Sequence, residues 1–197
     1  MVAAARYPCR RNFFFYAMVD SLLVLLTTLL MSGDLLFFED TTGMGGAVRQ
    51  STGQYTHVAM VERVGNEVYM IDASTAHGVA RRRLEVDGRV GVYRVDIPFD
   101  TLATLSKARS LVGKPYDFRF LPNNDAYYCS ELIVECYKDT DGHQLFTNKP
   151  MRFRDARGRM PRYWRKHFRR LHMAVPEGID GSNPTDLSRA DCLKKVL

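Results

Sequence analysis

The stretch that decides the fold is Asp125-Ala126-Tyr127-Tyr128-Cys129-Ser130-Glu131-Leu132-Ile133-Val134. From Cys129 onward, apolar residues recur at spacings of three and four, which predicts a helix with one buried face. The polar run 123–125 (Asn-Asn-Asp) offers N-cap residues just before it. A cysteine in the first turn of a helix lies at the positive end of the helix dipole, which favours the nucleophilic thiolate. The competing interpretation is a plain core cysteine, because free cysteines are among the most buried residues.

The second deciding stretch is Tyr55-Thr56-His57-Val58-Ala59-Met60-Val61, which alternates as a strand does. Gly65-Asn66 predicts a turn, and residues 67–71 return as a second strand of a hairpin. Residues near Ala59 then lie opposite residues near Asp72, so Asp72 can approach His57 and hold its tautomer. A neutral imidazole that reaches Cys129 can accept the thiol proton. The alternative for His57 is an ordinary core or surface histidine, and that for Asp72 a residue of the turn at the strand end.

Two other residues compete with Asp72 as the third member of such a site. Glu62 lies an odd number of residues from His57, so strand alternation turns it to the other face. His77 is close in sequence, but the adjacent Gly78 indicates a turn. The remaining histidines and cysteines show no spacing typical of metal ligands, so we expect no metal site and no cofactor.

The other elements complete an α+β pattern. Strands are expected at 33–38 and 90–95, a turn leading into a short helix at 41–52, and helices at 102–112, with Gly113 as C-cap, and at 163–171. The stretch 176–184 is rich in Gly and Pro and reads as a loop. A chain of 197 residues with 46% hydrophobic residues suits one domain with a substantial core.

Positive charge is concentrated in a basic segment, residues 149–172. Residues 149–170 hold ten of the 28 Lys and Arg residues and one acid, Asp155, which leaves 18 basic and 21 acidic residues elsewhere. The basic segment could bind an anionic polymer or a membrane surface, and its interleaved aromatic residues could stack on bases. We favour a solvated helix face with its aromatic side chains turned into the core. Nucleic acid is not an expected partner, because no motif of an RNA- or DNA-binding module is present.

Residues 1–32 read as a hydrophobic leader. Three arginines (Arg6, Arg10, Arg11) precede the stretch 13–31, whose only charge is Asp20. This order resembles a signal peptide or a short anchor, although Asp20 would be costly within a bilayer. An extended start is the alternative. Export or attachment at the cell envelope follows if the leader is a signal or an anchor, and a cytoplasmic location follows otherwise.

Several motifs, taken in order along the chain, resemble the YiiX/YaeF-type permuted papain-like enzymes, which belong with the NlpC-type cysteine peptidases and amidases. They are Gly33-Asp34-Leu35-Leu36-Phe37, the His57 strand, Gly113-Lys114-Pro115-Tyr116-Asp117, Tyr128-Cys129-Ser130-Glu131-Leu132, Val175-Pro176-Glu177-Gly178 and Gly181-Ser182-Asn183-Pro184. The resemblance covers about residues 33–190. We therefore expect one papain-like catalytic domain over 33–197, outside the leader.

This resemblance implies a circularly permuted papain-like fold, an antiparallel sheet or small barrel packed against helices, with the nucleophile at a helix N-terminus. The family's nucleophile matches Cys129, its base His57 and its third polar residue Asp72, where Glu would be expected. Within its motifs, Tyr116 and Tyr128 are expected to contact substrate. The implied activity is hydrolysis of an amide, with cell-wall peptides and lipid acyl groups as substrate classes. A thiol acyltransferase and a catalytically inactive binding module for an anionic envelope polymer are the alternatives.

Overall fold

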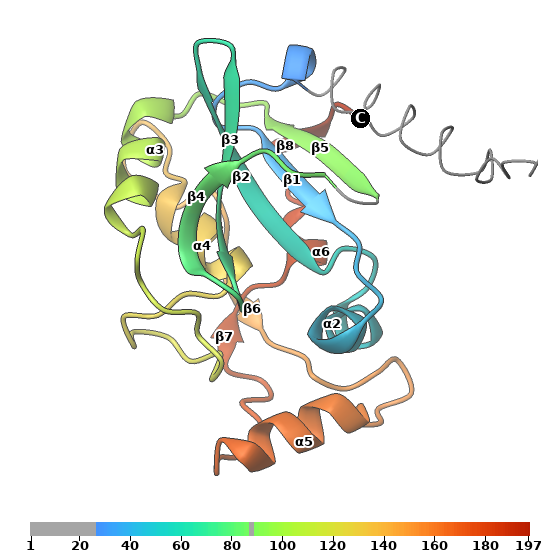
Figure 1. The fold of residues 1–197 in the computed structure, drawn as a ribbon. Coiled ribbons are helices and arrows are strands. Elements are labelled where there is room, and N and C mark those ends of the chain that lie inside the picture. The colour runs from blue at the N-terminus through green and yellow to red at the C-terminus, as the bar shows by residue number, and fades with distance from the viewer. Residues whose placement is uncertain (1–26, 87–88) are drawn as a thin grey trace, which may run out of the picture.

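The computed structural model describes residues 27–86 and 89–197, and its centre is an antiparallel sheet (Figure 1). The strand order is linear, β4-β3-β2-β1-β5-β8, so the sheet is open and not a barrel. Its strands are β1 (Leu35–Phe38), β2 (His57–Val64), β3 (Glu67–Ser74), β4 (Gly78–Arg83), β5 (Val90–Val95) and β8 (Leu193–Lys195). A separate two-stranded ribbon pairs β6 (Lys149–Pro150) with β7 (Asp180–Gly181).

The β2–β3 hairpin forms as its sequence predicts. Met60 pairs with Ile71 and Val64 with Glu67, around a turn that contains Gly65 in a left-handed conformation. Continued by one pair beyond Met60 and Ile71, this register brings Ala59 opposite Asp72. Both strands have long runs of buried residues because helices cover one face of the sheet and a second apolar cluster covers the other.

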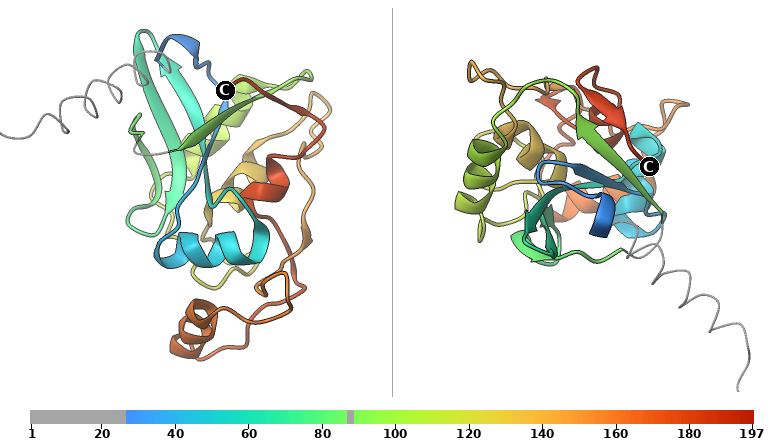
Figure 2. Two further views of the ribbon diagram at one scale, coloured as in Figure 1. Left: turned by 90° about the vertical axis from the view of Figure 1, so that its right-hand side faces the viewer. Right: turned by 90° about the horizontal axis from the view of Figure 1, so that it is seen from above.

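The helix that begins at Cys129, α4 (Cys129–Cys136), packs against β2 and β3. α3 (Thr101–Ser110) lies beside α4 and covers the same face of the sheet (Figures 1 and 2). Leu132 and Ile133 of α4 are fully buried in this layer, together with Leu105 and Ala108 of α3. This core fixes where α4 begins relative to the strands, and therefore where Cys129 lies.

Two further helices, α2 (Gly43–Thr52) and α5 (Arg162–Arg170), pack against one another at one end of the molecule (Figures 1 and 2). Trp164 and Phe168 of α5 are buried, and the basic residues of α5 are exposed. The interpretation of this helix as a solvated basic face over an aromatic core is confirmed. A short α6 (Pro184–Leu187) packs near α4, and the expected loop at 176–184 is interrupted by β7 and ends where α6 begins.

Two details of the local predictions were wrong, and one strand was missed. The N-cap of α4 is Tyr128, and not one of the polar residues at 123–125. Asn123 and Asp125 take left-handed backbone conformations in the loop before the helix. α3 ends at Ser110 with Leu111 as its C-cap, two residues before Gly113. The strand β4 was not predicted, because its run of arginines at 81–83 hides the alternation.

The predicted leader falls largely on residues 1–26, which lie outside the described residues. Its last residues pack on the domain, where Leu30 is buried and the Leu30 carbonyl accepts a hydrogen bond from Arg63 Nε at 2.9 Å. Arg94 donates to the Leu29 carbonyl and forms an ion pair with buried Asp34. In the described part of the chain, no helix is long and apolar enough to cross a membrane.

Candidate active site

Cys129 is the first residue of α4, and its position is fixed by the loop before it. The Tyr127 N–H donates to the Pro115 carbonyl and the Asp117 N–H donates to the Tyr127 carbonyl, so the segment around Tyr116 runs beside Tyr127. The Tyr128 N–H donates to the Glu131 carboxyl at 3.4 Å, which closes the first turn. The first N–H groups of a helix have no acceptor within the helix, so the start of α4 is suited to bind a negative charge beside Cys129.

His57 begins β2 and is oriented by a carboxylate from the neighbouring strand. Its Nε2 lies 2.7 Å from Asp72 Oδ2. Asp72 is 1% exposed, and Arg82 Nη2 donates to both of its oxygens, at 3.0 and 3.1 Å. Arg82 shares the face of Asp72 because Ala80, two residues earlier on β4, is the register partner of Asp72. Since Asp72 engages Nε2, Nδ1 is the ring nitrogen left for Cys129.

The surroundings of His57 favour its protonated form. Burial opposes the imidazolium, but the negative charge of Cys129 and the hydrogen bond and charge of Asp72 outweigh it and raise the pKa of His57 to about 10. Burial likewise opposes the Asp72 carboxylate, but the hydrogen bond and charge of His57 and the charge of Arg82 hold the pKa of Asp72 below its usual range. The imidazolium is therefore stabilised from both sides, by Cys129 and by Asp72.

Glu131, in the same turn as Cys129, adds little charge at neutral pH. Burial raises the pKa of its carboxyl to about 8, although the Tyr128 N–H that it accepts acts in the opposite direction. The neutral carboxyl can close the turn of α4 without placing a full negative charge beside the thiol.

The structure separates the two rival residues from His57. Glu62 is as buried as Asp72, but its carboxylate pairs with Arg81 and Arg109. His77 is exposed in the turn before β4, where its N–H donates to the Ser74 carbonyl. Asp72 is thus the acid that the structure places on His57, as strand alternation predicts.

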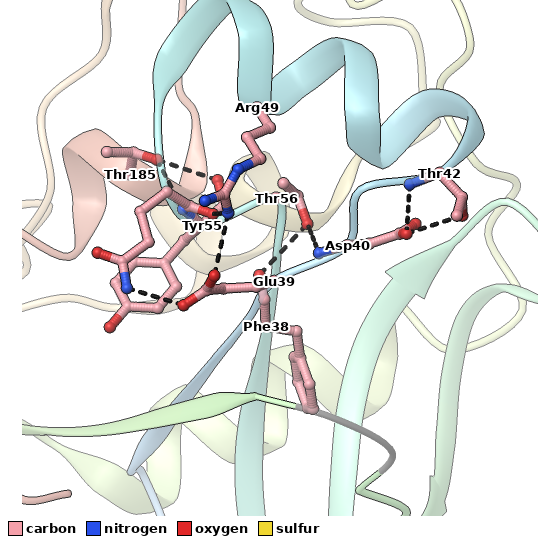
Figure 3. A network of polar contacts seen from close by, with 9 residues as sticks. Phe38, Glu39, Asp40, Thr42, Arg49, Tyr55, Thr56 and Thr185 are labelled. Atoms are coloured by element: carbon pink, nitrogen blue, oxygen red, sulfur yellow. Dashed lines mark hydrogen bonds and ion pairs between the residues drawn. The ribbon is translucent and has the colours of Figure 1, made fainter.

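A network of polar contacts joins the residues just before β2 to the segment that leads into α2 (Figure 3). Thr56 Oγ1 accepts from the Asp40 N–H at 2.8 Å and donates to the Phe38 carbonyl, while Asp40 accepts from the backbone and hydroxyl of Thr42. On the other side, the Tyr55 N–H donates to Thr185 Oγ1 at 3.0 Å. These bonds hold together the segments before and after α2 and fix the start of the strand that carries His57.

A cavity of about 390 Å³ opens beside these groups, within the range of small-molecule sites. His57, Asp72, Arg82 and Cys129 all line it. Its remaining wall comes from β3, α2, the segment around Tyr116 to Tyr128, residues 151–153, α5 and residues 182–184. A substrate in this cavity would therefore reach Cys129 and His57 together.

Tyr116 and Tyr128, the expected substrate contacts, also line the cavity. Both hydroxyls have protein partners. The Tyr128 hydroxyl accepts from the Ser182 N–H at 3.0 Å, and the Tyr116 hydroxyl points to the sulfur of Met44. Burial and then the charge of Cys129 raise the pKa of Tyr116, so both rings are neutral parts of the wall close to the sulfur.

The expectation of no metal site stays a prediction. One group of metal-ligand side chains in residues 27–86 and 89–197 lies close together, Asp139, Asp141 and His143, within 4.8 Å. Asp139 Oδ1 already accepts the N–H groups of Asp141 and His143, and its Oδ2 lies 3.5 Å from His143 Nδ1. The three residues form a closed polar turn that does not line the cavity. We derive no catalytic step through a metal from them.

An antiparallel sheet with a cysteine at the start of the covering helix, and a histidine–carboxylate pair on the strands beneath, defines a papain-like protein. Its histidine precedes its cysteine along the chain, which places it among the permuted members of that class. The chain belongs to the family of permuted papain-like amidase enzymes, YaeF/YiiX, or C92, whose sequence pattern matches residues 30–197. The prediction of a permuted papain-like fold is confirmed.

A solved structure supports the same fold. The crystal structure of the metalloprotein YiiX from Escherichia coli O157:H7 superposes with a TM-score of 0.70, at 20% sequence identity. The match covers 86% of this chain and 97% of that chain. No curated protein is detectably similar to this chain.

Sequence reasoning missed Arg82 and most of the cavity wall. Arg82 lies in β4, which was not predicted. A prediction that residues 78–83 pair with β3 would have placed Arg82 near Asp72. The wall residues Met44 and Val48 of α2 and Trp164 of α5 come from helices that were predicted, but their common cavity depends on long-range packing.

Proposed function

We propose that this chain is a cysteine amidase that acts through Cys129, His57 and Asp72. The observation that supports this proposal is the hydrogen bond between His57 Nε2 and the buried Asp72 carboxylate, together with a His57 pKa raised by the charge of Cys129 and by Asp72. A histidine that only packs in a core has no need of a charged partner on each side. Membership of an amidase family supports the same reaction class.

The reaction begins when the Cys129 thiol gives its proton to His57 Nδ1. The thiolate attacks the carbonyl carbon of an amide, and the N–H groups at the start of α4 bind the oxyanion. His57 then donates its proton to the leaving nitrogen as the C–N bond breaks, which leaves a thioester on Cys129. Water, deprotonated by His57, attacks the thioester and releases a carboxylic acid and the free thiol. Asp72 keeps the imidazole oriented and stabilises its charged form.

The test is labelling with a thiol-reactive acyl probe. Cys129→Ala should lose the label, and His57→Gln should slow labelling strongly because the thiol loses its base. Cys136→Ala is the matched control: it lies on the same helix, and burial raises the pKa of the Cys136 thiol to about 12, so it should not react. Full labelling of Cys129→Ala, or loss of labelling in Cys136→Ala with the fold intact, would contradict the proposal.

A further inference from the structure

The outer face of α5 carries a row of basic side chains, which we call the cationic row. It consists of Arg162, Arg165, Lys166 and Arg169, all of them exposed. Positions i, i+3, i+4 and i+7 of a helix share one face, so these charges stand together along about 10 Å of the helix axis. In residues 27–86 and 89–197, none of the four side chains forms an ion pair or a hydrogen bond. The cationic row is therefore free to bind a partner.

Several arginines of the sheet, in contrast, are neutralised within the domain. Arg94 pairs with buried Asp34, and Arg81 pairs with buried Glu62. α5 contains no acidic residue that could do the same for the cationic row. Like charges three and four residues apart destabilise an isolated helix. A row of such charges without a counter-charge in the domain indicates a partner that supplies negative charge.

The cationic row frames an open depression of the surface, and no other residue of the described chain lines it. A guanidinium donates paired hydrogen bonds to two oxygens of one phosphate group, and an ammonium adds a compact positive charge. Three arginines and one lysine around one depression therefore suit several phosphate groups that lie side by side.

The aromatic side chains of α5 are not available to stack on bases. Trp164 and Phe168 are 2% and 1% exposed. Tyr163 stacks on His167, whose Nε2 lies 2.7 Å from the Phe118 carbonyl oxygen. Proteins that bind single-stranded nucleic acids combine basic grooves with aromatic rings on which bases stack. The outer face of α5 offers charge without such rings, which favours a layer of lipid headgroups over a nucleic acid.

The position of α5 suits contact with a flat surface. It forms one end of the molecule, with its cationic row on the outside (Figures 1 and 2). Its inner face contributes Trp164 to the wall of the cavity beside Cys129. A surface that binds the cationic row would therefore hold the cavity end of the molecule close to it.

We propose that the cationic row is an electrostatic docking site for an anionic membrane surface. The anionic groups of the lipid headgroups bind the four basic side chains, and the aromatic face of α5 stays packed in the protein. This inference concerns where the protein works, and it does not depend on the bond that Cys129 attacks.

Co-sedimentation of the full chain with phosphatidylcholine vesicles, with and without phosphatidylserine, tests the docking site. One basic residue near an anionic bilayer raises affinity about fivefold, so Arg165→Gln with Lys166→Gln should weaken binding to the anionic vesicles about 25-fold. Salt at about 1 M, where the Debye length is about 3 Å, should release the wild-type protein.

Lys194→Gln with Lys195→Gln is the matched control. Both lysines are exposed on β8, at the other end of the molecule from α5, and their loss changes the net charge equally (Figures 1 and 2). This variant should bind the anionic vesicles as the wild type does. An equal loss of binding in the two double variants, or wild-type binding to neutral vesicles as strong as to anionic ones, overturns the inference.

Trp164, the single tryptophan of the chain, reports how α5 is oriented on the vesicle. Lipids brominated in their acyl chains should not quench its fluorescence, because Trp164 is buried on the face of α5 turned away from the cationic row. Strong quenching would mean that the aromatic face enters the bilayer, which contradicts the inference. Binding to a single-stranded oligonucleotide without binding to anionic vesicles would assign the cationic row to nucleic acid and overturn it as well.

Discussion

Replacing Asp72 by Asn should lower the pKa of His57 by about one to two units from its value of about 10. The substitution keeps the shape of the side chain and removes its charge. A hydrogen bond to a charged group contributes about 1.5–3 kcal/mol, and one pKa unit corresponds to about 1.4 kcal/mol. The ionised Arg82, which now pairs with both oxygens of Asp72, would lose its counter-charge and oppose the imidazolium further.

The direction of the pH effect follows from the raised pKa. A histidine whose pKa is higher in the folded protein than its ordinary value of about 6.5 stabilises the fold fully below that value. This stabilisation is lost as the pH rises through the folded pKa near 10. In Asp72→Asn the loss should begin at the same pH but be complete one to two pH units earlier, and the protonated form of His57 beside Cys129 should disappear earlier by the same interval.

The pKa of His57 is measured from the imidazole ring signals in an NMR titration, and the ion pair from the rate of Cys129 alkylation against pH. Glu62→Gln is the matched control, since Glu62 is as buried as Asp72 and paired with two arginines, yet does not touch His57. It should reduce stability and leave the His57 titration unchanged. An unchanged pKa in Asp72→Asn, or an equal shift in Glu62→Gln, would refute the reasoning.

Three further outcomes are expected. Cys129→Ser should also lower the pKa of His57, because a neutral hydroxyl replaces the negative charge that raises it; an NMR titration that matches the wild type would contradict this. Tyr128→Phe should cost about 1 kcal/mol in urea unfolding, because the Ser182 N–H loses its buried acceptor, and an unchanged midpoint would argue against that bond. The exposed cations of α5 should bind anionic vesicles. The double variant Arg165→Glu with Lys166→Glu should abolish co-sedimentation with these vesicles. If the wild-type protein bound neutral vesicles as strongly as anionic ones, charge would not be the cause.

The hairpin that carries His57 was predictable because all its determinants are local. Alternation sets the face of each side chain, and the Gly65-Asn66 turn sets the register, so the approach of Asp72 to His57 followed from the sequence. The helix that begins at Cys129 was predictable for a similar reason, since its apolar periodicity is clear. The N-cap was wrong because Tyr128 has no strong capping preference, and tertiary packing of the loop decided the boundary.

The cavity was not predictable, because no local pattern encodes it. Its apolar wall joins Val48 of α2 to Trp164 of α5, more than a hundred residues apart, and its polar wall needs Arg82 on a strand that the sequence pattern hides. The interleaved aromatic and basic residues of α5 did predict an amphipathic helix. What they could not show is that Trp164 faces the cavity of the candidate active site.

The reversed order of histidine and cysteine has no cost for the proposed chemistry. The reaction needs His57 beside its acid and the Cys129 helix packed over both, and these are contacts within a hairpin and between α4 and its two strands. Because Asp72 lies on the return strand of the same hairpin, this pair forms whether the cysteine helix comes before or after it in the chain. A circular permutation therefore changes where the chain begins and ends and leaves the contact between His57 and Asp72 intact. The order of His57 and Cys129 along the chain distinguishes the permuted members of the class, and the hairpin register determines whether Asp72 reaches His57.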